Sequence, residues 1–248
     1  MDRMAYSLRL IEDRLAPGAV YADSLPALNR VIYVAAGQLA MALGSESVRL
    51  SSDTARRGSG TPAVRAGAEG AHVLRFELCA QPPPSPGGGR VILEHPIAVD
   101  ARARWLMRCD RVDFEPGGVA LPHRHRGGGI RRLLWGRLEV TVGDAPARVM
   151  RPGDAWFESG REPVLAVSAA DEATSFARVS VLPAEFRGRS SIMYVDPADA
   201  ARSRPRTYTV YVDEPITLGS EGGLATTSAQ RVPPRREAAS IDRRGRTS

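Results

Sequence analysis

Short runs of apolar and β-branched residues, each bounded by glycine, proline or aspartate, dominate the pattern along the chain. In the second half these runs cover residues 105–114, 133–142, 147–150 and 176–182, and several alternate between apolar and polar positions. Such alternation over four to eight residues is typical of strands. Before the C-terminal region, no stretch carries a long helical stripe with capping residues. The pattern therefore predicts an all-β chain built as a sandwich or barrel.

The sequence repeats itself with a shift of 99 residues. Aligned pairs, found without a gap, are Arg9 with Arg108, Pro17 with Pro116, Gly18 with Gly117, Gly37 with Gly136 and Gly44 with Gly143. Farther along, Arg75 aligns with Arg178 at a shift of 103, which implies a length difference of four residues. Glycine and proline at matched positions imply matched turns. We therefore expect the two halves to follow the same backbone path.

Proline, glycine and polar residues mark the segments outside the repeats. The run QPPPSPGGG at 81–89 cannot pair in a sheet and is interpreted as a loop between the repeats, and the polar run at 51–60 as an insert. Beyond Gly219 the composition is polar. The predicted domains are a degenerate barrel at 1–81, a linker and leading strand at 82–100, a second barrel with an extension at 101–216, and a disordered basic tail at 217–248.

The charge lies mostly at the C-terminal end. All 34 basic residues are arginine, the net charge is +6, and residues 231–248 contribute six arginines against two acidic residues. The absence of lysine excludes lysine Schiff-base chemistry and a phosphate-loop lysine. The tail has no aromatic residue for base stacking and no recognisable module, so nucleic-acid binding is not expected. Two cysteines, Cys79 and Cys109, are too few for a disulfide scaffold and are predicted to pack in the core.

Hydropathy gives no sign of a membrane segment. The longest apolar run, at 31–43, is interrupted by Gly37 and Gln38 and falls short of the roughly 20 residues that a span needs. The first eleven residues carry Asp2, Arg3 and Arg9 and lack the apolar core of a signal peptide. We therefore expect a cytoplasmic protein without membrane contact.

The second repeat resembles the cupin superfamily. Gly117, five intervening residues, His123-x-His125 and the closing Gly136 are similar to the first cupin motif, and Arg151-Pro-Gly-Asp-Ala-Trp-Phe is similar to the second. The resemblance covers roughly residues 105–182. It implies two tandem jelly-roll (cupin) β-barrels, a bicupin, in which the first barrel is a degenerate copy.

The resemblance also implies where a metal would bind. Active metal cupins use two histidines and a glutamate of the first motif and a histidine of the second. His123 and His125 occupy the first two positions, and their spacing places both side chains on one face of a strand. Gly129 stands at the glutamate position and Val164 at the second-motif histidine position. In the first repeat, Ser24 and Pro26 stand at the histidine positions.

Two histidines alone make an incomplete site, since such sites need a third ligand. Glu158 and Glu162 are the nearest candidate carboxylates. A bound ion would be Fe, Mn, Ni or Zn; the alternative is a polar pocket without metal. His72 and His95 lie outside the motifs and are interpreted as ordinary surface or hydrogen-bonded histidines.

Arginines and tryptophans next to the motifs are the other candidates. Arg131 and Arg30 lie near the ligand strand of each barrel, and an inward arginine would suit a carboxylate or phosphate. Arg132 must face the opposite way from Arg131, so one of the two is expected to be exposed to solvent. Trp135 and Trp156 are expected to pack in the core, with substrate stacking by Trp156 as the alternative.

Two functions from different classes stay open at this point. The first is a cupin that binds a small, possibly anionic molecule in the second barrel, with Arg131 and Trp156 as ligand-binding residues. The alternative is a metal-dependent enzyme (dioxygenase, decarboxylase, isomerase or lyase) that uses His123 and His125. No catalytic residue or substrate follows from the sequence. Two fused barrels can pair within one chain, so we expect a monomeric pseudo-dimer or a homodimer.

Overall fold

The computed structural model describes residues 5–21, 25–202 and 206–218. Strands dominate this part of the chain, with two single-turn 3₁₀ helices, η1 (Ala184–Phe186) and η2 (Pro197–Ala201). None of the described helices has the length and hydropathy to cross a membrane. Both repeats belong to one compact unit that ends at Leu218. The predicted basic tail lies, from residue 219 onward, outside the described residues. The all-β prediction is confirmed.

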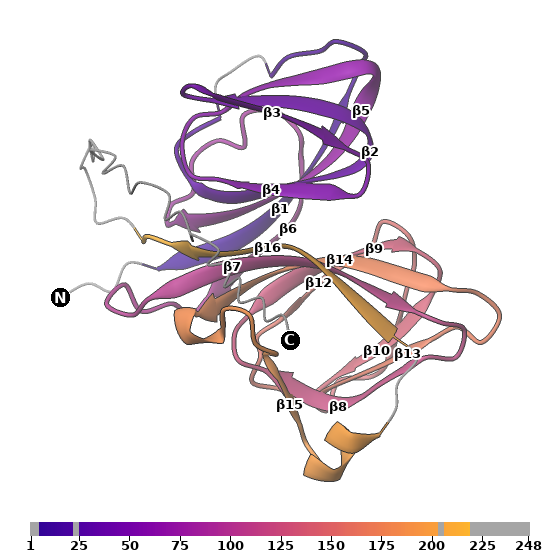
Figure 1. The fold of residues 1–248 in the computed structure, drawn as a ribbon. Coiled ribbons are helices and arrows are strands. Elements are labelled where there is room, and N and C mark those ends of the chain that lie inside the picture. The colour runs from indigo at the N-terminus through magenta and orange to yellow at the C-terminus, as the bar shows by residue number, and fades with distance from the viewer. Residues whose placement is uncertain (1–4, 22–24, 203–205, 219–248) are drawn as a thin grey trace, which may run out of the picture. The chain divides into compact units, whose positions relative to one another are not determined.

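The first half forms one six-stranded sheet that is coloured indigo to violet in Figure 1. Its strands are β1 (Tyr6–Leu15), β2 (Asn29–Leu43), β3 (Glu46–Ser51), β4 (Thr54–Gly58), β5 (Ala63–Ala80) and β6 (Arg90–Ile97). They are ordered β3-β2-β5-β1-β6, and β4 also pairs with β2. Register shifts near Val34 and Gly37 interrupt the pairing of β2 with β5. Bulges bend strands, so this sheet wraps around a core of its own.

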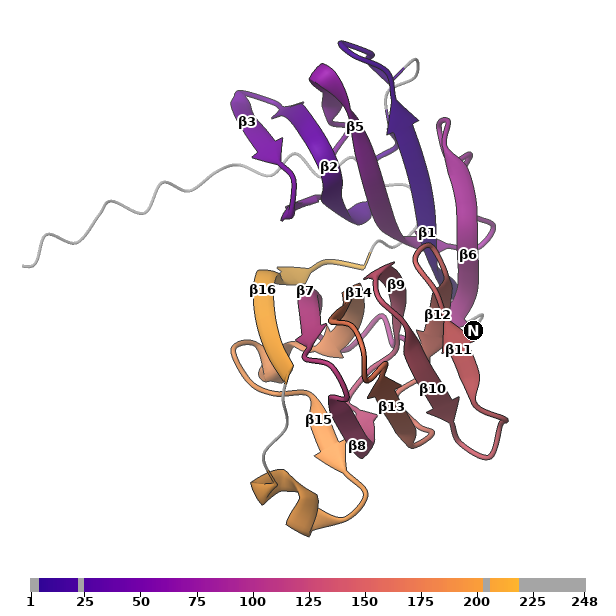
Figure 2. The same ribbon diagram turned by 90° about the vertical axis from the view of Figure 1, so that its right-hand side faces the viewer.

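The second half forms two five-stranded antiparallel sheets, seen edge-on in Figure 2. Its strands are β7 (Trp105–Phe114), β8 (Val119–His125), β9 (Gly129–Trp135), β10 (Leu138–Val142), β11 (Arg148–Met150), β12 (Ala155–Glu158), β13 (Val164–Ser168), β14 (Thr174–Pro183), β15 (Ile192–Tyr194) and β16 (Arg206–Ile216). One sheet has the order β11-β10-β13-β8-β15 and the other β12-β9-β14-β7-β16. This is the jelly-roll barrel that the sequence predicts.

Three apolar clusters hold the fold together. One fills the first barrel, a second fills the second barrel, and the largest joins side chains of both halves, including Leu8 and Phe76 from the first and Cys109 and Val179 from the second. Central strands such as β1 and β14 are therefore buried on both faces over most of their length. Charged residues such as Arg9 and Arg178 are buried along with their apolar residues. Both cysteines are free and buried, as expected.

The internal repeat is confirmed by backbone geometry at the turns. Matched glycines have nearly equal positive φ angles: 67° and 71° at Gly18 and Gly117, 77° and 78° at Gly37 and Gly136, and 59° and 57° at Gly44 and Gly143. A β-carbon on Gly37 would meet the Gly70 carbonyl oxygen, and one on Gly136 would meet that of Ala173. Glycine is thus required at these positions by both conformation and close approach.

Strand register repeats in the same way. Ile32 pairs with Arg75 in the first barrel, and Arg131 pairs with Arg178 in the second. These pairs are related by the two predicted shifts, 99 residues on one strand and 103 on the other. The histidine strand β8 is the exception. Its counterpart in the described part of the first barrel is a single bridge between Val20 and Arg65, and Ser24 lies outside the described residues.

Two segment predictions need correction. The polar run at 51–60 is not an insert, because it contains β4, and its Asp53 contacts Tyr33 and Arg111. The strand that follows the proline-rich loop, β6, pairs with β1 and completes the first sheet rather than opening the second barrel. The polar composition of the run at 51–60 was misleading. The strand β4 pairs with β2 alone and is only partly buried, so it needs few apolar residues.

Candidate functional site

A small cavity lies inside the second barrel, between its two sheets. Its volume of about 20 Å³ has room for one water-sized group. The polar side chains that line it are His123 and His125 of β8, Arg131 of β9, Glu158 of β12, Arg178 of β14 and Tyr208 of β16. All of these except Tyr208, which is 42% exposed, are buried. The cavity therefore reaches the surface beside Tyr208.

A row of charged residues crosses one sheet of this barrel. Arg131 of β9 lies directly opposite Arg178 of β14, which in turn lies opposite Asp110 of β7. Like charges opposite one another destabilise a sheet, so each arginine needs an acidic partner. Arg178 has one in Asp110, to which it donates two hydrogen bonds of 2.8 and 2.5 Å. Arg131 is paired with Glu158 instead.

Glu158 is the centre of the polar cluster. Its Oε1 accepts a hydrogen bond of 2.8 Å from the indole nitrogen of Trp156. Its Oε2 lies 2.6 Å from Arg131 Nη2 and 3.4 Å from His125 Nε2. The contact with Arg131 lacks the alignment of a hydrogen bond, so Nη2 and Oε2 are buried without hydrogen-bond partners. The two atoms are joined by this ion pair alone, so each keeps unused hydrogen-bonding capacity in the cavity.

The two histidines stand side by side on β8. Their rings are 4.8 Å apart, centre to centre, and nearly perpendicular. The Nδ1 atom of His123 lies 2.7 Å from the Leu121 carbonyl oxygen. Only a protonated Nδ1 can donate to a carbonyl, so the Nε2 atom of a neutral His123 is an acceptor. The prediction that both side chains point into the barrel is thus supported by the geometry.

Burial controls the protonation states in this cavity. Desolvation lowers the pKa of His123 and brings the pKa of His125 down to about 3, so both rings are neutral near pH 7. Burial by itself would raise the pKa of Glu158, but the charge of Arg131 and the hydrogen bonds from His125 and Trp156 together outweigh it and keep that pKa well below its usual range. Desolvation lowers the pKa of Arg131 to about 10, which leaves it cationic at neutral pH.

The two candidate carboxylates for a third ligand, Glu158 and Glu162, differ in where they lie. Glu158 is buried at the cavity, whereas Glu162 is exposed and bonded to Ser159. Glu158 also lies opposite Gly129, the position where the motif has its glutamate. A β-carbon on Gly129 would meet the Val179 carbonyl oxygen at 2.5 Å, so this barrel has no room for a side chain there. Val164, the other substituted position, pairs with His123 and is apolar.

Arg131 and Trp156 both line the cavity. Trp156 is also buried in the apolar core of the second barrel, as expected, and ligand binding by either residue stays a prediction. Arg132 does not lie at the surface. It is buried because its guanidinium reaches the first barrel, where Nη2 donates to Glu12 at 3.0 Å. Arg131 is buried as well, so the expectation that one of these two arginines is exposed to solvent is wrong. The first barrel covers Arg132 instead.

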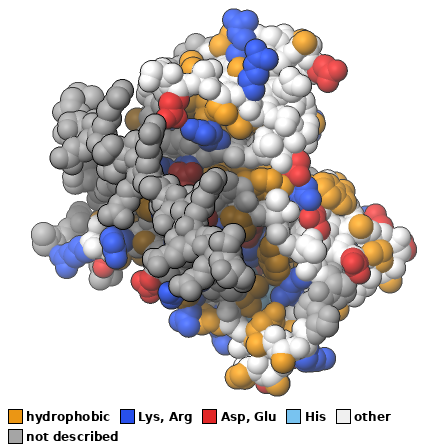
Figure 3. All heavy atoms as spheres, in the orientation of Figure 1, with side chains coloured by type: hydrophobic (Ala, Val, Ile, Leu, Met, Phe, Trp, Pro, Cys, Tyr) orange, Lys and Arg blue, Asp and Glu red, His pale blue; other side chains and the backbone are white. Residues whose placement is uncertain are grey.

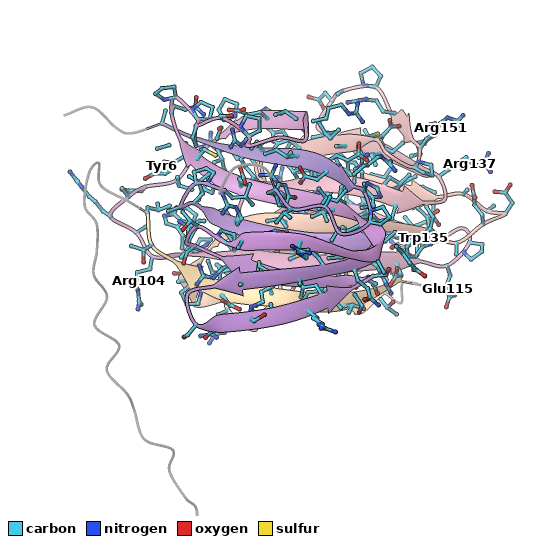
Figure 4. The ribbon with its side chains drawn as sticks, turned by 90° about the horizontal axis from the view of Figure 1, so that it is seen from above. Tyr6, Arg104, Glu115, Trp135, Arg137 and Arg151 are labelled. Carbon is cyan, nitrogen blue, oxygen red and sulfur yellow. The ribbon has the colours of Figure 1, made fainter. Side chains whose placement is uncertain are left out.

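Trp135 is a second correction. It is 45% exposed and packs only against the guanidinium of Arg111. Figure 4 shows it on the same end of the strands as Glu115 and Arg137, away from Tyr6 and Arg104. It is the last residue of β9, directly before the turn at Gly136. A side chain at the end of a strand can lie beyond the core, and the apolar pattern along the strand does not show where the strand ends.

The remaining candidates from the sequence lie outside the cavity. His72 contacts Glu12 at 2.8 Å, and His95 stacks on Phe157 with ring centres 3.8 Å apart. Arg30 is fully buried in the first barrel and donates to Glu77. It therefore serves an internal ion pair rather than a ligand. The two histidines are hydrogen-bonded or stacked, as expected.

Three site residues escaped the sequence analysis as such: Asp110, Arg178 and Tyr208. The sequence singled out Arg178 only through its alignment with Arg75, and no motif around Arg178 indicates that its side chain faces the barrel interior. Asp110 becomes meaningful once the register places it opposite Arg178. Tyr208 lies on β16, about 85 residues beyond His123, and its ring covers Arg178 at 6.0 Å. Only the strand order brings it to the cavity mouth.

Two larger hollows are open to solvent and lack comparable chemistry. One, of about 600 Å³, is lined by Glu12, Arg14, Arg90 and Arg132, and all three arginines engage Glu12. The other, of about 470 Å³, runs along Phe157 and the Gly127–Gly128 turn. On the face shown in Figure 3, arginine and acidic side chains are interspersed rather than gathered by sign. The small cavity inside the second barrel is therefore the candidate site.

The donor set does not fit a divalent cation as it lies. His123, His125 and Glu158 all line the cavity. The Glu158 oxygen nearest to His125, Oε2, is ion-paired with the guanidinium of Arg131. In the described part of the chain, no three histidine, cysteine, aspartate or glutamate side chains are grouped so as to hold a metal ion. We therefore derive no chemistry through a metal for this arrangement.

Comparison with known proteins supports the fold. Residues 110–178 match the family model of the cupin domain. Among solved structures, AerE from Microcystis aeruginosa is 14% identical with a TM-score of 0.51, and the alignment covers 71% of this chain and 87% of AerE. A tryptophan-to-tyrosine variant of oxalate decarboxylase from Bacillus subtilis is 14% identical, with a TM-score of 0.58 and coverage of 82% and 78%.

A further structure, on the Mn(II) centres of Bacillus subtilis oxalate decarboxylase, is 12% identical with a TM-score of 0.56, again with coverage of 82% and 78%. No curated protein matches the chain. The second barrel thus matches the cupin domain over residues 110–178. The long alignments with oxalate decarboxylase show that the two-barrel fold extends over both halves, and at these identities they show the fold alone.

Proposed function

We propose that the second barrel binds a small hydroxyl-bearing molecule without the help of a metal. The observation that carries this proposal is the pair of buried atoms without hydrogen-bond partners, Arg131 Nη2 and Glu158 Oε2. The first is a donor and the second an acceptor. One group that both accepts and donates satisfies the two atoms together, and a hydroxyl is the smallest such group a ligand can offer.

Charge balance favours a hydroxyl over an anion at the buried end. Each guanidinium in the cavity already has its own carboxylate, Glu158 for Arg131 and Asp110 for Arg178. A carboxylate ligand would accept from Arg131 but would face Glu158 without a proton to donate. The expectation of an anionic ligand rested on an unpaired Arg131, and the ion pair removes its basis.

The size and mouth of the cavity define how such a ligand enters. A volume of about 20 Å³ admits a single hydroxyl, so the rest of the molecule lies toward the surface beside Tyr208. At the inner end, the neutral Nε2 of His123 offers a further acceptor. Trp156 bonds Glu158 and orients its carboxylate, so it serves as a positioning residue rather than as a stacking platform.

Ligand-detected NMR with four probes tests the proposal: ethylene glycol, glycolate, acetate and oxalate. We expect the two hydroxyl-bearing compounds to bind and the other two not to bind. A His123→Ala/His125→Ala double variant should lose binding, while the matched His72→Ala/His95→Ala variant, which removes the other two histidines of the chain, should keep it. Binding of acetate or oxalate but not of the hydroxyl compounds would contradict the proposal.

A metal-dependent cupin enzyme is the second candidate. Convergence of His123, His125 and Glu158 favours it, together with the fold shared with an oxalate decarboxylase that has Mn(II) centres. The position of Arg131 weighs against it. Metal content of protein purified without an affinity tag separates the two candidates, because an enzyme of this class would carry about one ion per chain.

A further inference from the structure

The guanidinium of Arg131 lies at the point where the donors of the cavity converge. Glu158 Oε2 is shared between His125 Nε2 at 3.4 Å and Arg131 Nη2 at 2.6 Å. Two neutral imidazoles and one carboxylate are the donor types of a metal site with open positions. In this chain, the positive charge beside the Glu158 carboxylate is not a metal ion but the guanidinium of Arg131.

The side chain of Arg131 is held in this position by burial and by a hydrogen bond to the backbone. It is 1% exposed, and its Nη1 donates a hydrogen bond of 2.6 Å to the Gly129 carbonyl oxygen. A divalent cation bound to Glu158 Oε2 would lie beside this guanidinium in a buried site, where like charges repel strongly. The other cavity arginine, Arg178, is fully engaged by Asp110 and does not compete for Glu158.

The internal repeat shows that the backbone does not require an arginine at this position. In the first barrel the equivalent residue is Ile32, which pairs with Arg75 as Arg131 pairs with Arg178. Ile32 is buried in the apolar core of its barrel. The same strand pairing thus accepts an uncharged side chain of moderate size.

We propose that Arg131 is a resident cation that takes the place of a divalent metal. Its removal then allows His123, His125 and Glu158, which as they lie are not grouped to hold an ion, to close around one. The wild-type barrel then excludes the metal through one side chain. This inference shares the metal-free premise of the proposed function but does not depend on which small molecule binds.

Metal content provides the test. Tag-free wild type and Arg131→Met are stripped with EDTA, incubated with Co(II), desalted and analysed by elemental mass spectrometry and visible absorption. We expect the wild type to retain far less than one ion per chain and Arg131→Met to retain about one, with an absorption band of bound Co(II). Adding His123→Ala and His125→Ala to Arg131→Met should abolish the gain.

Two matched variants isolate the charge of Arg131. Arg131→Lys keeps a positive charge in the cavity and should remain without metal. Arg124→Met removes an arginine of β8, in the opposite sheet, whose side chain bonds the Arg161 carbonyl outside the cavity, and it should behave as the wild type. Equal metal uptake by Arg131→Met and Arg124→Met would overturn the proposal.

Arg131→Met leaves Glu158 buried without its cation and is expected to be less stable. If it does not fold alone, refolding from urea with Co(II) present becomes the readout: the proposal requires that Co(II) restores folding. Failure of Co(II) to do so, while Arg131→Met/Glu158→Gln folds, overturns it. A stoichiometric ion in the wild type that is lost in His123→Ala/His125→Ala overturns it directly. Absence of hydroxyl-ligand binding affects only the proposed function.

Discussion

The interiors of the two barrels share a strand register but use their buried charges differently. In the first barrel, Arg9, Arg30 and Arg75 all donate to Glu77, and Arg75 also donates to Asp13. Carbonyl groups of the proline-rich loop at 81–89 accept further bonds from Arg9 and Arg75. That loop, which the sequence analysis treats as a connection, therefore satisfies the buried arginines of the first barrel.

The second barrel has fewer buried partners for its charges. The two cavity arginines, Arg131 and Arg178, each have one carboxylate. Among the described residues, no carbonyl accepts a hydrogen bond from Arg131 Nη2 and no group donates one to Glu158 Oε2. The histidine strand β8 is present here, whereas its counterpart in the first barrel is reduced to one described bridge. The comparison teaches that one scaffold supports a self-satisfied core and a cavity with open bonding capacity. The difference comes from a few side chains and one loop.

The largest expected effect comes from breaking the first network. Glu77→Gln removes the charge that three buried arginines share, and leaves an acidic partner, Asp13, to Arg75 alone among them. Loss of one member of a buried charge network costs about 3–5 kcal/mol of unfolding free energy. Urea denaturation followed by circular dichroism measures it. Glu46→Gln, at an exposed ion pair with Arg56, should cost about 1 kcal/mol or less. Equal small losses in both variants would contradict the network.

A smaller effect is expected from the orienting bond in the second barrel. Trp156→Phe keeps an aromatic ring but removes the hydrogen bond to Glu158 Oε1, and a bond to a buried charge contributes about 1.5–3 kcal/mol. Trp135→Phe is the matched control, because Trp135 is 45% exposed and its replacement should change stability by about 0.5 kcal/mol or less. Thermal and urea denaturation of both variants checks the difference. A larger loss at Trp135 would refute the assignment.

The smallest and most gradual effect concerns pH at the contact between the barrels. Burial would raise the pKa of Glu12, but hydrogen bonds from Arg90 and His72 and the charge of Arg132 lower it to about 2. A carboxylate whose pKa is lower in the folded than in the unfolded state stabilises the fold above its ordinary pKa of 4.5. That stabilisation should be lost progressively as the pH falls from about 4.5 to about 2.

Urea denaturation at several pH values between 7 and 2 measures this loss. Glu12→Gln should start from a lower stability at pH 7 and lose less of it through the same window, because its side chain does not titrate. Added salt should weaken the effect in the wild type, since two of the arginines around Glu12, Arg14 and Arg90, are largely exposed. An unchanged acid slope in Glu12→Gln would show that other carboxylates dominate.

The sequence by itself determined the all-β class, the repeat and the inward direction of the histidines. These follow from local rules: strands alternate with a period of two, and turns with positive φ need glycine, so Gly37 and Gly136 mark the same turn twice. It also placed Arg131 and Glu158 among the candidates, because both lie close to the motifs along the chain.

Only the tertiary structure decided what those residues do. The partnership of Arg131 with Glu158 depends on the pairing of β9 with β12, and that of Arg178 with Asp110 on the pairing of β14 with β7. The burial of Arg132 depends on Glu12, 120 residues away. Long-range strand pairing sets which charged residues lie next to each other. Burial makes each ion pair necessary, because a charge removed from water must be paired inside the protein. No local pattern in the chain records that partner.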